Sequence, residues 1–187
     1  EAAVEEDPSN RDSIQELTLA YIDVGSFEAA DALIDRYVER FPRDIEFYGN
    51  KIADYVWIVR ARKAAAIGAD GLRDHPTDDG IAYQIHRAYL MNGQVDDARQ
   101  LETRIRGSST LVRSARLVVQ LRQACAEGRN DDANDLVEQI LVEPTSELAT
   151  KWLSLQTVGR FDDATTLIAS RDNPEEVVEL ASFLTYY

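Results

Sequence analysis

Apolar side chains recur at helical spacing near the start of the chain. A first stripe, at intervals of three or four residues, consists of Ile14, Leu17, Tyr21 and Val24. A second stripe consists of Phe27, Ala30, Leu33, Ile34, Tyr37 and Phe41. This spacing places each set on one face of a helix. Gly25 separates the stripes and Pro42 follows the second, so the pattern predicts two helices joined by a tight glycine turn and ended by a proline.

The turn recurs along the chain as a short string: a glycine, any residue, a usually apolar residue, two mostly acidic residues and an alanine. The glycines are Gly25, Gly93, Gly128 and Gly159, and the alanines are Ala30, Ala98, Ala133 and Ala164. Val59 and Ala64 occupy the two positions in a further copy. Ala30, Ala64 and Ala98 stand 34 residues apart, and the next intervals are 35 and 31. The sequence therefore predicts a helix-turn-helix unit repeated about five times.

Each predicted hairpin leaves an apolar face that it cannot bury alone. An alanine at the recurring position has almost no side chain, so the two helices of a hairpin can approach closely there. Stacking the next hairpin on the exposed face buries it, and repetition of this step builds a solenoid.

The period and the pattern resemble the tetratricopeptide repeat (TPR) family. The first unit matches at Leu17, Ala20, Tyr21, Gly25, Phe27, Ala30, Tyr37 and Pro42. The third unit matches at Ile85, Ala88, Tyr89, Gly93, Val95, Ala98 and Ile105. The resemblance implies an all-α fold, a right-handed superhelical solenoid of TPR-like hairpins.

We expect a single TPR-like domain over residues 11–187. The five repeats are predicted at about 11–44, 45–78, 79–112, 113–144 and 145–173. Residues 174–187 begin with Pro174-Glu-Glu and are predicted to form a C-terminal capping helix. Residues 1–10 are acidic, contain Pro8 and are predicted to be a frayed N-terminus.

The charge balance limits the classes of partner. Lys and Arg total 20 against 34 Asp and Glu, a net charge of −14, and such a surface repels nucleic acid and anionic membranes. No apolar run reaches the roughly 20 residues that span a bilayer, so we expect no membrane insertion by this chain. A cytoplasmic location is favoured. Because the chain starts at Glu1 and not at Met, a periplasmic location or a membrane tether upstream is the alternative.

The sequence offers little for catalysis. One cysteine and two histidines almost exclude a His/Cys zinc site, so we expect no metal and no cofactor. A glycine-rich phosphate loop, a nucleophile elbow and the common zinc motifs are all missing, and we therefore expect no enzyme activity. The acidic pairs are Asp96-Asp97, Asp131-Asp132 and Asp162-Asp163. They fall in predicted first helical turns, where negative charge is favourable, and a structural role explains them best.

The resemblance to TPR proteins also implies a binding surface, because the first helices of such hairpins line a concave groove. The groove residues implied here, called the wall, are Leu19, Ile22, Trp57, Tyr83, Arg87, Leu90, Met91, Val118 and Arg122. Aromatic residues and arginine dominate interface hot spots. The first hypothesis is a non-catalytic scaffold that binds a protein or peptide segment in this groove. The competing interpretation of the wall is packing between neighbouring repeats.

A second functional hypothesis places the chain in a larger molecule. In this interpretation it is the C-terminal sensory or assembly module of a bacterial regulator. It would then act through self-association, as a homodimer, or through contacts with other domains of the same protein.

Overall fold

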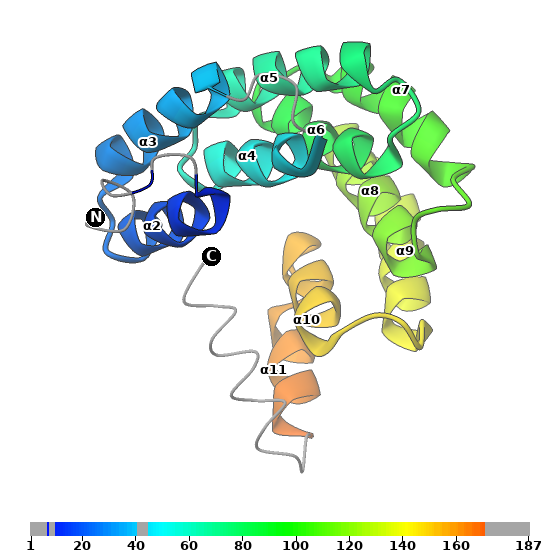
Figure 1. Ribbon diagram of the computed structural model, residues 1–187. Coiled ribbons are helices and arrows are strands. Elements are labelled where there is room, and N and C mark those ends of the chain that lie inside the picture. Colours follow the sequence, from blue (N-terminus) through cyan, green and yellow to red (C-terminus); the bar gives the residue numbers. More distant parts are fainter. Residues whose placement is uncertain (1–6, 8–9, 41–44, 171–187) are drawn as a thin grey trace. The chain divides into compact units, whose positions relative to one another are not determined.

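Ten α-helices, packed as sequential pairs, make up the part of the chain that the structure describes (Figure 1). A computed structural model describes residues 7, 10–40 and 45–170, without the side chains of residues 45–47 and 57. The first three pairs are α2 (Arg11–Asp23) with α3 (Phe27–Arg40), α4 (Ile45–Trp57) with α5 (Ala61–Asp74), and α6 (Asp79–Met91) with α7 (Val95–Arg106). The last two are α8 (Arg113–Ala126) with α9 (Asn130–Val142), and α10 (Leu148–Thr157) with α11 (Phe161–Ala169).

The chain divides into two compact units, residues 1–88 (unit 1) and 89–187 (unit 2). One helix pair falls within each of the five predicted repeat ranges. The single domain over 11–187 stays a prediction. The predicted capping helix at 174–187 and most of the predicted frayed segment 1–10 lie outside the described residues.

A residue with positive φ joins the two helices of every pair. The values are 72° at Gly25, 58° at Val59, 75° at Gly93, 69° at Gly128 and 79° at Gly159. Positive φ lets the backbone reverse in a few residues, and glycine adopts it without steric cost. The predicted tight turn is confirmed in all five copies, including the one in which Val59 stands at the glycine position.

In unit 1 the first pair of helices closes over a small core. Ile14, Leu33 and Tyr37 are buried together, and Leu17 and Tyr21 pack against them. Two members of the predicted apolar stripes are exposed instead of buried. The side chains of Val24 and Phe27 are 75% and 42% exposed, because they flank the turn at Gly25, where the helices end. Phe41 and Pro42, predicted to end the second stripe, lie outside the described residues.

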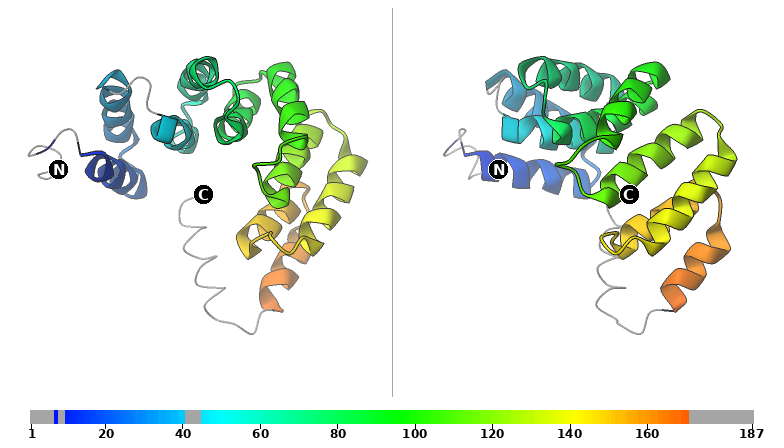
Figure 2. Two further views of the ribbon diagram at one scale, coloured as in Figure 1. Left: turned by 45° about the vertical axis from the view of Figure 1, so that its right-hand side comes forward. Right: turned by 90° about the vertical axis from the view of Figure 1, so that its right-hand side faces the viewer.

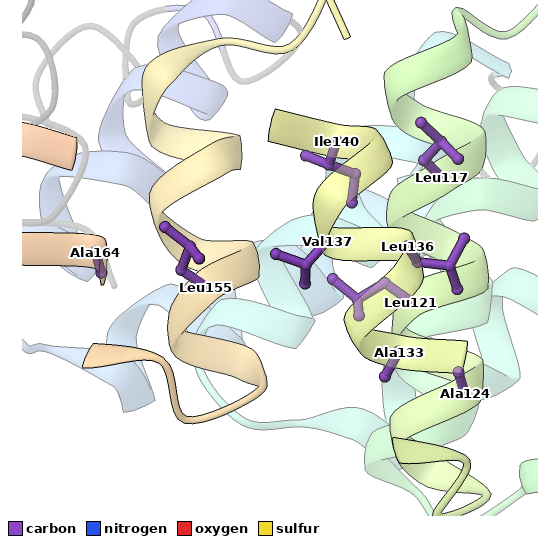
Figure 3. Packing of buried hydrophobic residues seen from close by; sticks show 9 residues of the cluster. All are labelled: Leu117, Leu121, Ala124, Ala133, Leu136, Val137, Ile140, Leu155 and Ala164. Atoms are coloured by element: carbon purple, nitrogen blue, oxygen red, sulfur yellow. The ribbon is translucent and has the colours of Figure 1, made fainter. Parts of the chain in front are cut away.

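In unit 2 the last four helices supply one apolar core (Figure 3). The helices α8 and α9 lie side by side and antiparallel (Figure 2). Leu121 from α8, Val137 and Ile140 from α9, and Leu155 from α10 are each at most 2% exposed. Figure 3 shows these side chains pointing toward one another between the helices.

Small residues allow the close approach of the paired helices. Each of the recurring alanines is 0–1% exposed: Ala30, Ala64, Ala98, Ala133 and Ala164. Their predicted place between the two helices of each pair is therefore consistent with their burial. In unit 1, Gly68 and Gly71 on α5 are also buried, and both face α6. The close approach at these glycines sets the position of α6, which carries four wall residues.

Candidate partner-binding surface

Unit 1 contains five of the nine wall residues. On α2, Leu19 is half-buried, and Ile22 is buried at 9% exposure. Tyr83 and Arg87 are half-buried on α6. The side chain of Trp57, at the end of α4, lies outside the described residues.

Unit 2 contains the other four wall residues. Leu90 is half-buried and Met91 is 43% exposed at the end of α6. Val118 and Arg122 are half-buried on α8, and Val118 packs against the core of unit 2. Part of the wall thus contributes to packing, as at Ile22 and Val118, while Met91 presents apolar surface to solvent.

The two units repeat one local arrangement on a first helix. Tyr83 and Arg87 are four residues apart on α6, and Val118 and Arg122 are four residues apart on α8. Residues at this spacing are neighbours on a helix surface. Each unit therefore sets an apolar or aromatic side chain beside an arginine.

A buried ion pair lies beside α2 in unit 1. The Lys51 Nζ atom lies 3.0 Å from Asp54 Oδ2 and donates to Gln15 Oε1 at 2.9 Å. The ammonium group also stands 5.2 Å from the centre of the Tyr37 ring, within the range of a cation–π contact. The Lys51 and Asp54 side chains are only 1% and 3% exposed. Burial raises the pKa of Asp54, although Lys51 and Gln15 oppose the shift.

Sequence reasoning missed this pair. Both residues lie on α4, three positions apart, which is the spacing of ordinary exposed helix pairs. Their burial comes from the helices that cover them. The one sequence signal was the rarity of lysine, since the chain has 17 Arg and only 3 Lys.

A second polar network ties α3 to the following hairpin of unit 1. Lys63 donates to Asp31 at 2.6 Å and to Asp35 at 2.7 Å, and Tyr55 donates to Asp35 at 2.6 Å. Burial, followed by the hydrogen bond to Asp35, raises the pKa of Tyr55. For Asp35, burial acts in the opposite direction, but the hydrogen bonds from Lys63 and Tyr55 lower its pKa. These contacts connect neighbouring helices, and they pair the Lys63 ammonium group with the carboxylates of Asp31 and Asp35.

Unit 2 has an equivalent network at the turn between α8 and α9. Glu127 accepts hydrogen bonds of 2.6 Å from Gln123, Arg99 and Arg129. The Gln123 bond contributes most, and together the three donors lower the pKa of Glu127 to about 2. Arg99 comes from α7, so the network links that helix to the α8–α9 turn.

A surface depression of about 310 Å³ lies in unit 2 and is strongly polar. Arg106, Arg129, Asp132 and Asp135 are among the residues that line it. Arg106 already donates to Glu102 at 2.9 Å, and Arg129 pairs with Asp132. Small-molecule pockets are mostly apolar with a few convergent polar groups, and this depression does not have that character.

The described residues hold no group of three or more His, Cys, Asp or Glu side chains placed to bind a metal. The three acidic pairs occupy first helical turns, as predicted. Cys125 is half-buried, and burial raises the pKa of its thiol. Within the described part of the chain, no helix is long and apolar enough to cross a bilayer.

Comparison with solved structures identifies the fold. A tetratricopeptide repeat protein from Parabacteroides merdae superposes with a TM-score of 0.62 at 15% identity, over 90% of this chain and 68% of the other. Two structures from Podosopora anserina, described as kinesin light chain nearly identical TPR-like repeats, are each 21% identical. The first has a TM-score of 0.58 over 87% of this chain and 92% of the other. The second has a TM-score of 0.57 over 96% and 98%.

No protein-family model matches the sequence, and no curated protein matches it. The structural matches nevertheless cover most of the chain. The chain has the TPR-like repeat fold, and the predicted resemblance and the all-α architecture are confirmed.

Proposed function

We propose that this chain is a non-catalytic scaffold that binds a protein or peptide segment along the first helices of its hairpins. TPR-like repeats generally mediate protein–protein interactions, and stacked hairpins offer extended surfaces for that purpose. The fold supports the general class of function. The partly exposed residues of the wall support the choice of this surface as the binding site.

The observation that carries the proposal is the repeated pair of side chains on α6 and α8. Tyr83 with Arg87 in unit 1, and Val118 with Arg122 in unit 2, are all half-buried. A half-buried side chain packs partly against its own protein and still presents surface to a ligand. Met91, 43% exposed, adds apolar area at the end of α6.

The chemistry of these pairs suits a short peptide segment. Buried aromatic and aliphatic contacts provide most of the affinity of a protein interface. An arginine beside them can bind a carboxylate through two parallel hydrogen bonds, which fixes the direction of the bound segment. The preferred segment would therefore combine apolar side chains with a single carboxylate.

Selection from a displayed library of random peptides tests the proposal. The full chain is immobilised beside an Arg87→Glu variant and an Arg122→Glu variant. A matched control is Arg36→Glu, which makes the same charge change at an exposed position on the second helix α3. Circular dichroism establishes that all four proteins have the same helix content.

We expect the parent and the control to enrich the same peptides and at least one wall variant to lose them. Binding that is equal in all four proteins would contradict the wall as the site. Light scattering on the parent addresses the self-association hypothesis. A dimer that Arg87→Glu or Arg122→Glu dissociates would assign the wall to self-association instead of a separate partner.

A further inference from the structure

Two consecutive turns of unit 1 expose apolar side chains at one edge. Val24 is 75% exposed at the end of α2, Phe27 is 42% exposed at the start of α3, and Val59 is 72% exposed in the α4–α5 turn. We call these three residues the turn edge. None of them belongs to the wall.

An arginine places the two turns next to each other. Arg60, the residue after Val59, has its Nε atom 3.2 Å from Asp31 Oδ2 and its Nη2 atom 3.9 Å from Glu28 Oε1. Glu28 lies in the first turn of α3, directly after Phe27, and Asp31 lies one turn further along the helix. The second turn therefore lies beside the start of α3, where Phe27 is exposed.

The fold does not require apolar residues at the two valine positions. Asn92 and Glu127 occupy the place of Val24 in the first two turns of unit 2. All three turns of unit 2 have glycine at the place of Val59. A β-branched residue at φ 58° is strained, and glycine would relieve that strain. The turn edge thus keeps an exposed, strained valine at a place where every other turn has glycine, and exposed apolar surface of this kind can mark an interaction site.

We propose that the turn edge binds a partner segment with apolar side chains flanked by lysine or arginine. The charge of the surrounding residues indicates this chemistry. Asp23 is exposed beside Val24, and the Glu28 side chain is 89% exposed beside Phe27. Arg60 pairs with both Asp31 and Glu28, so the three acids Asp23, Glu28 and Asp31 outnumber this one cation, and the first turn presents net negative charge to a ligand. Arg62 is exposed near the second turn, and the basic residue of the partner therefore faces the first turn.

Val59→Gly gives a discriminating test, because it removes the contact side chain and also removes backbone strain. A library of displayed random peptides is first depleted on the immobilised Val59→Gly protein and then selected on the parent. Peptides that survive are synthesised, and their affinities are measured by fluorescence anisotropy. The matched control is Val112→Gly, a second exposed valine outside a helix, in unit 2.

We expect the surviving peptides to combine apolar residues with lysine or arginine. Their affinity should fall about tenfold or more with Val59→Gly, the loss expected for one buried valine. A smaller fall is expected with Asp23→Asn and Glu28→Gln, and no change with Val112→Gly. Val59→Gly is expected to raise stability, and thermal unfolding of the variant establishes that a loss of binding does not come from unfolding.

Several results would overturn the proposal. They are a depleted library that yields no binders, survivors rich in acidic residues, or equal affinity for the parent and Val59→Gly. Dimerisation of the chain that Val59→Gly abolishes would assign the edge to a second copy and also overturn it. Arg87→Glu should leave these peptides bound, so the turn edge and the wall can fail independently.

Discussion

A Cβ atom on Gly68 would lie 2.3 Å from Cγ1 of Ile85, because α5 and α6 approach each other there with no side chain of α5 between them. One turn further along, a Cβ on Gly71 would meet the Tyr48 ring at 3.0 Å. The two glycines leave one face of α5 without side chains, so neighbouring residues can approach its backbone. Packing against this face holds the helix that carries Tyr83 and Arg87.

Gly68→Ala is expected to destabilise the protein by about 1–3 kcal/mol, the usual cost of overpacking a tight core. Urea unfolding followed by circular dichroism measures the change. Ile85→Ala removes the Cγ1 and Cδ1 atoms and leaves only its Cβ, 3.3 Å from the new Cβ, so Gly68→Ala should cost much less in that background. A cost that is the same in both backgrounds would mean that the two residues do not touch.

Gly49→Ala is the control for that experiment. Gly49 lies within α4, and a Cβ there would meet nothing within 4 Å. Alanine is favoured over glycine in a helix interior, so the variant should gain about 0.5–1 kcal/mol. A gain in unfolding free energy at Gly49 and a loss at Gly68 would separate the effect of helix propensity from the effect of packing.

Val59→Gly is expected to stabilise the protein by about 1 kcal/mol, because the left-handed conformation costs a β-branched residue roughly 1–2 kcal/mol and the flexibility of glycine returns part of that. The reciprocal change, Gly93→Val, should destabilise by a similar amount at φ 75°. Thermal unfolding of both variants provides the test. A drop in Tm for Val59→Gly would be inconsistent with strain at this turn.

Much of the fold could be predicted because its signals are local. The glycine or valine turn and the alanine five residues later recur at a fixed period, and both reflect backbone geometry within one hairpin. The positions of Val24 and Phe27 could not be predicted from helical spacing alone. Spacing assigns a face of a helix, but the depth of a residue also depends on how far the partner helix extends.

The Lys51–Asp54 pair gives a prediction about charge burial. Lys51→Met should cost about 3–5 kcal/mol at pH 7, because it leaves the Asp54 carboxylate buried without its cation. Burial raises the folded pKa of Asp54 above its unfolded value, so this variant should become more stable as the pH falls and the carboxyl binds a proton. Urea unfolding at pH 7 and pH 5 measures both effects.

The double variant Lys51→Met, Asp54→Leu is the companion experiment. It removes both charges and should be less destabilised than Lys51→Met alone, since hydrophobic replacement of a whole buried pair is often tolerated. If the double variant is less stable than Lys51→Met, the loss of stability does not come from the unpaired Asp54 carboxylate.

Glu127 predicts an acid-dependent loss of stability in unit 2. Its pKa is lowered from 4.5 to about 2 by the hydrogen bonds from Gln123, Arg99 and Arg129. The folded protein gains the full stabilisation from ionised Glu127 above pH 4.5, the pKa of this group in the unfolded chain. That stabilisation is lost as the pH falls toward 2. Glu127→Gln should be less stable than the parent at pH 6, and the difference should shrink by pH 3. A difference that does not change with pH would exclude this linkage.

The wall was harder to predict than the hairpins. The resemblance to TPR proteins supplies which helix lines the surface, but the depth of each side chain depends on its neighbours. Ile22 is buried at 9% exposure and Val118 packs on the core, whereas Met91 remains 43% exposed. No periodic signal distinguishes these three residues, because all are apolar residues on first helices.

Hydrogen exchange of the full chain, with and without the tightest selected peptide, shows which helices the peptide covers. For a peptide whose binding Arg87→Glu or Arg122→Glu abolishes, we expect slower exchange in α6 around Tyr83 and Arg87, or in α8 around Val118 and Arg122. Protection confined to the second helices α3, α5, α7, α9 and α11 would contradict this expectation. In that case the binding surface would lie on the opposite helices of the hairpins.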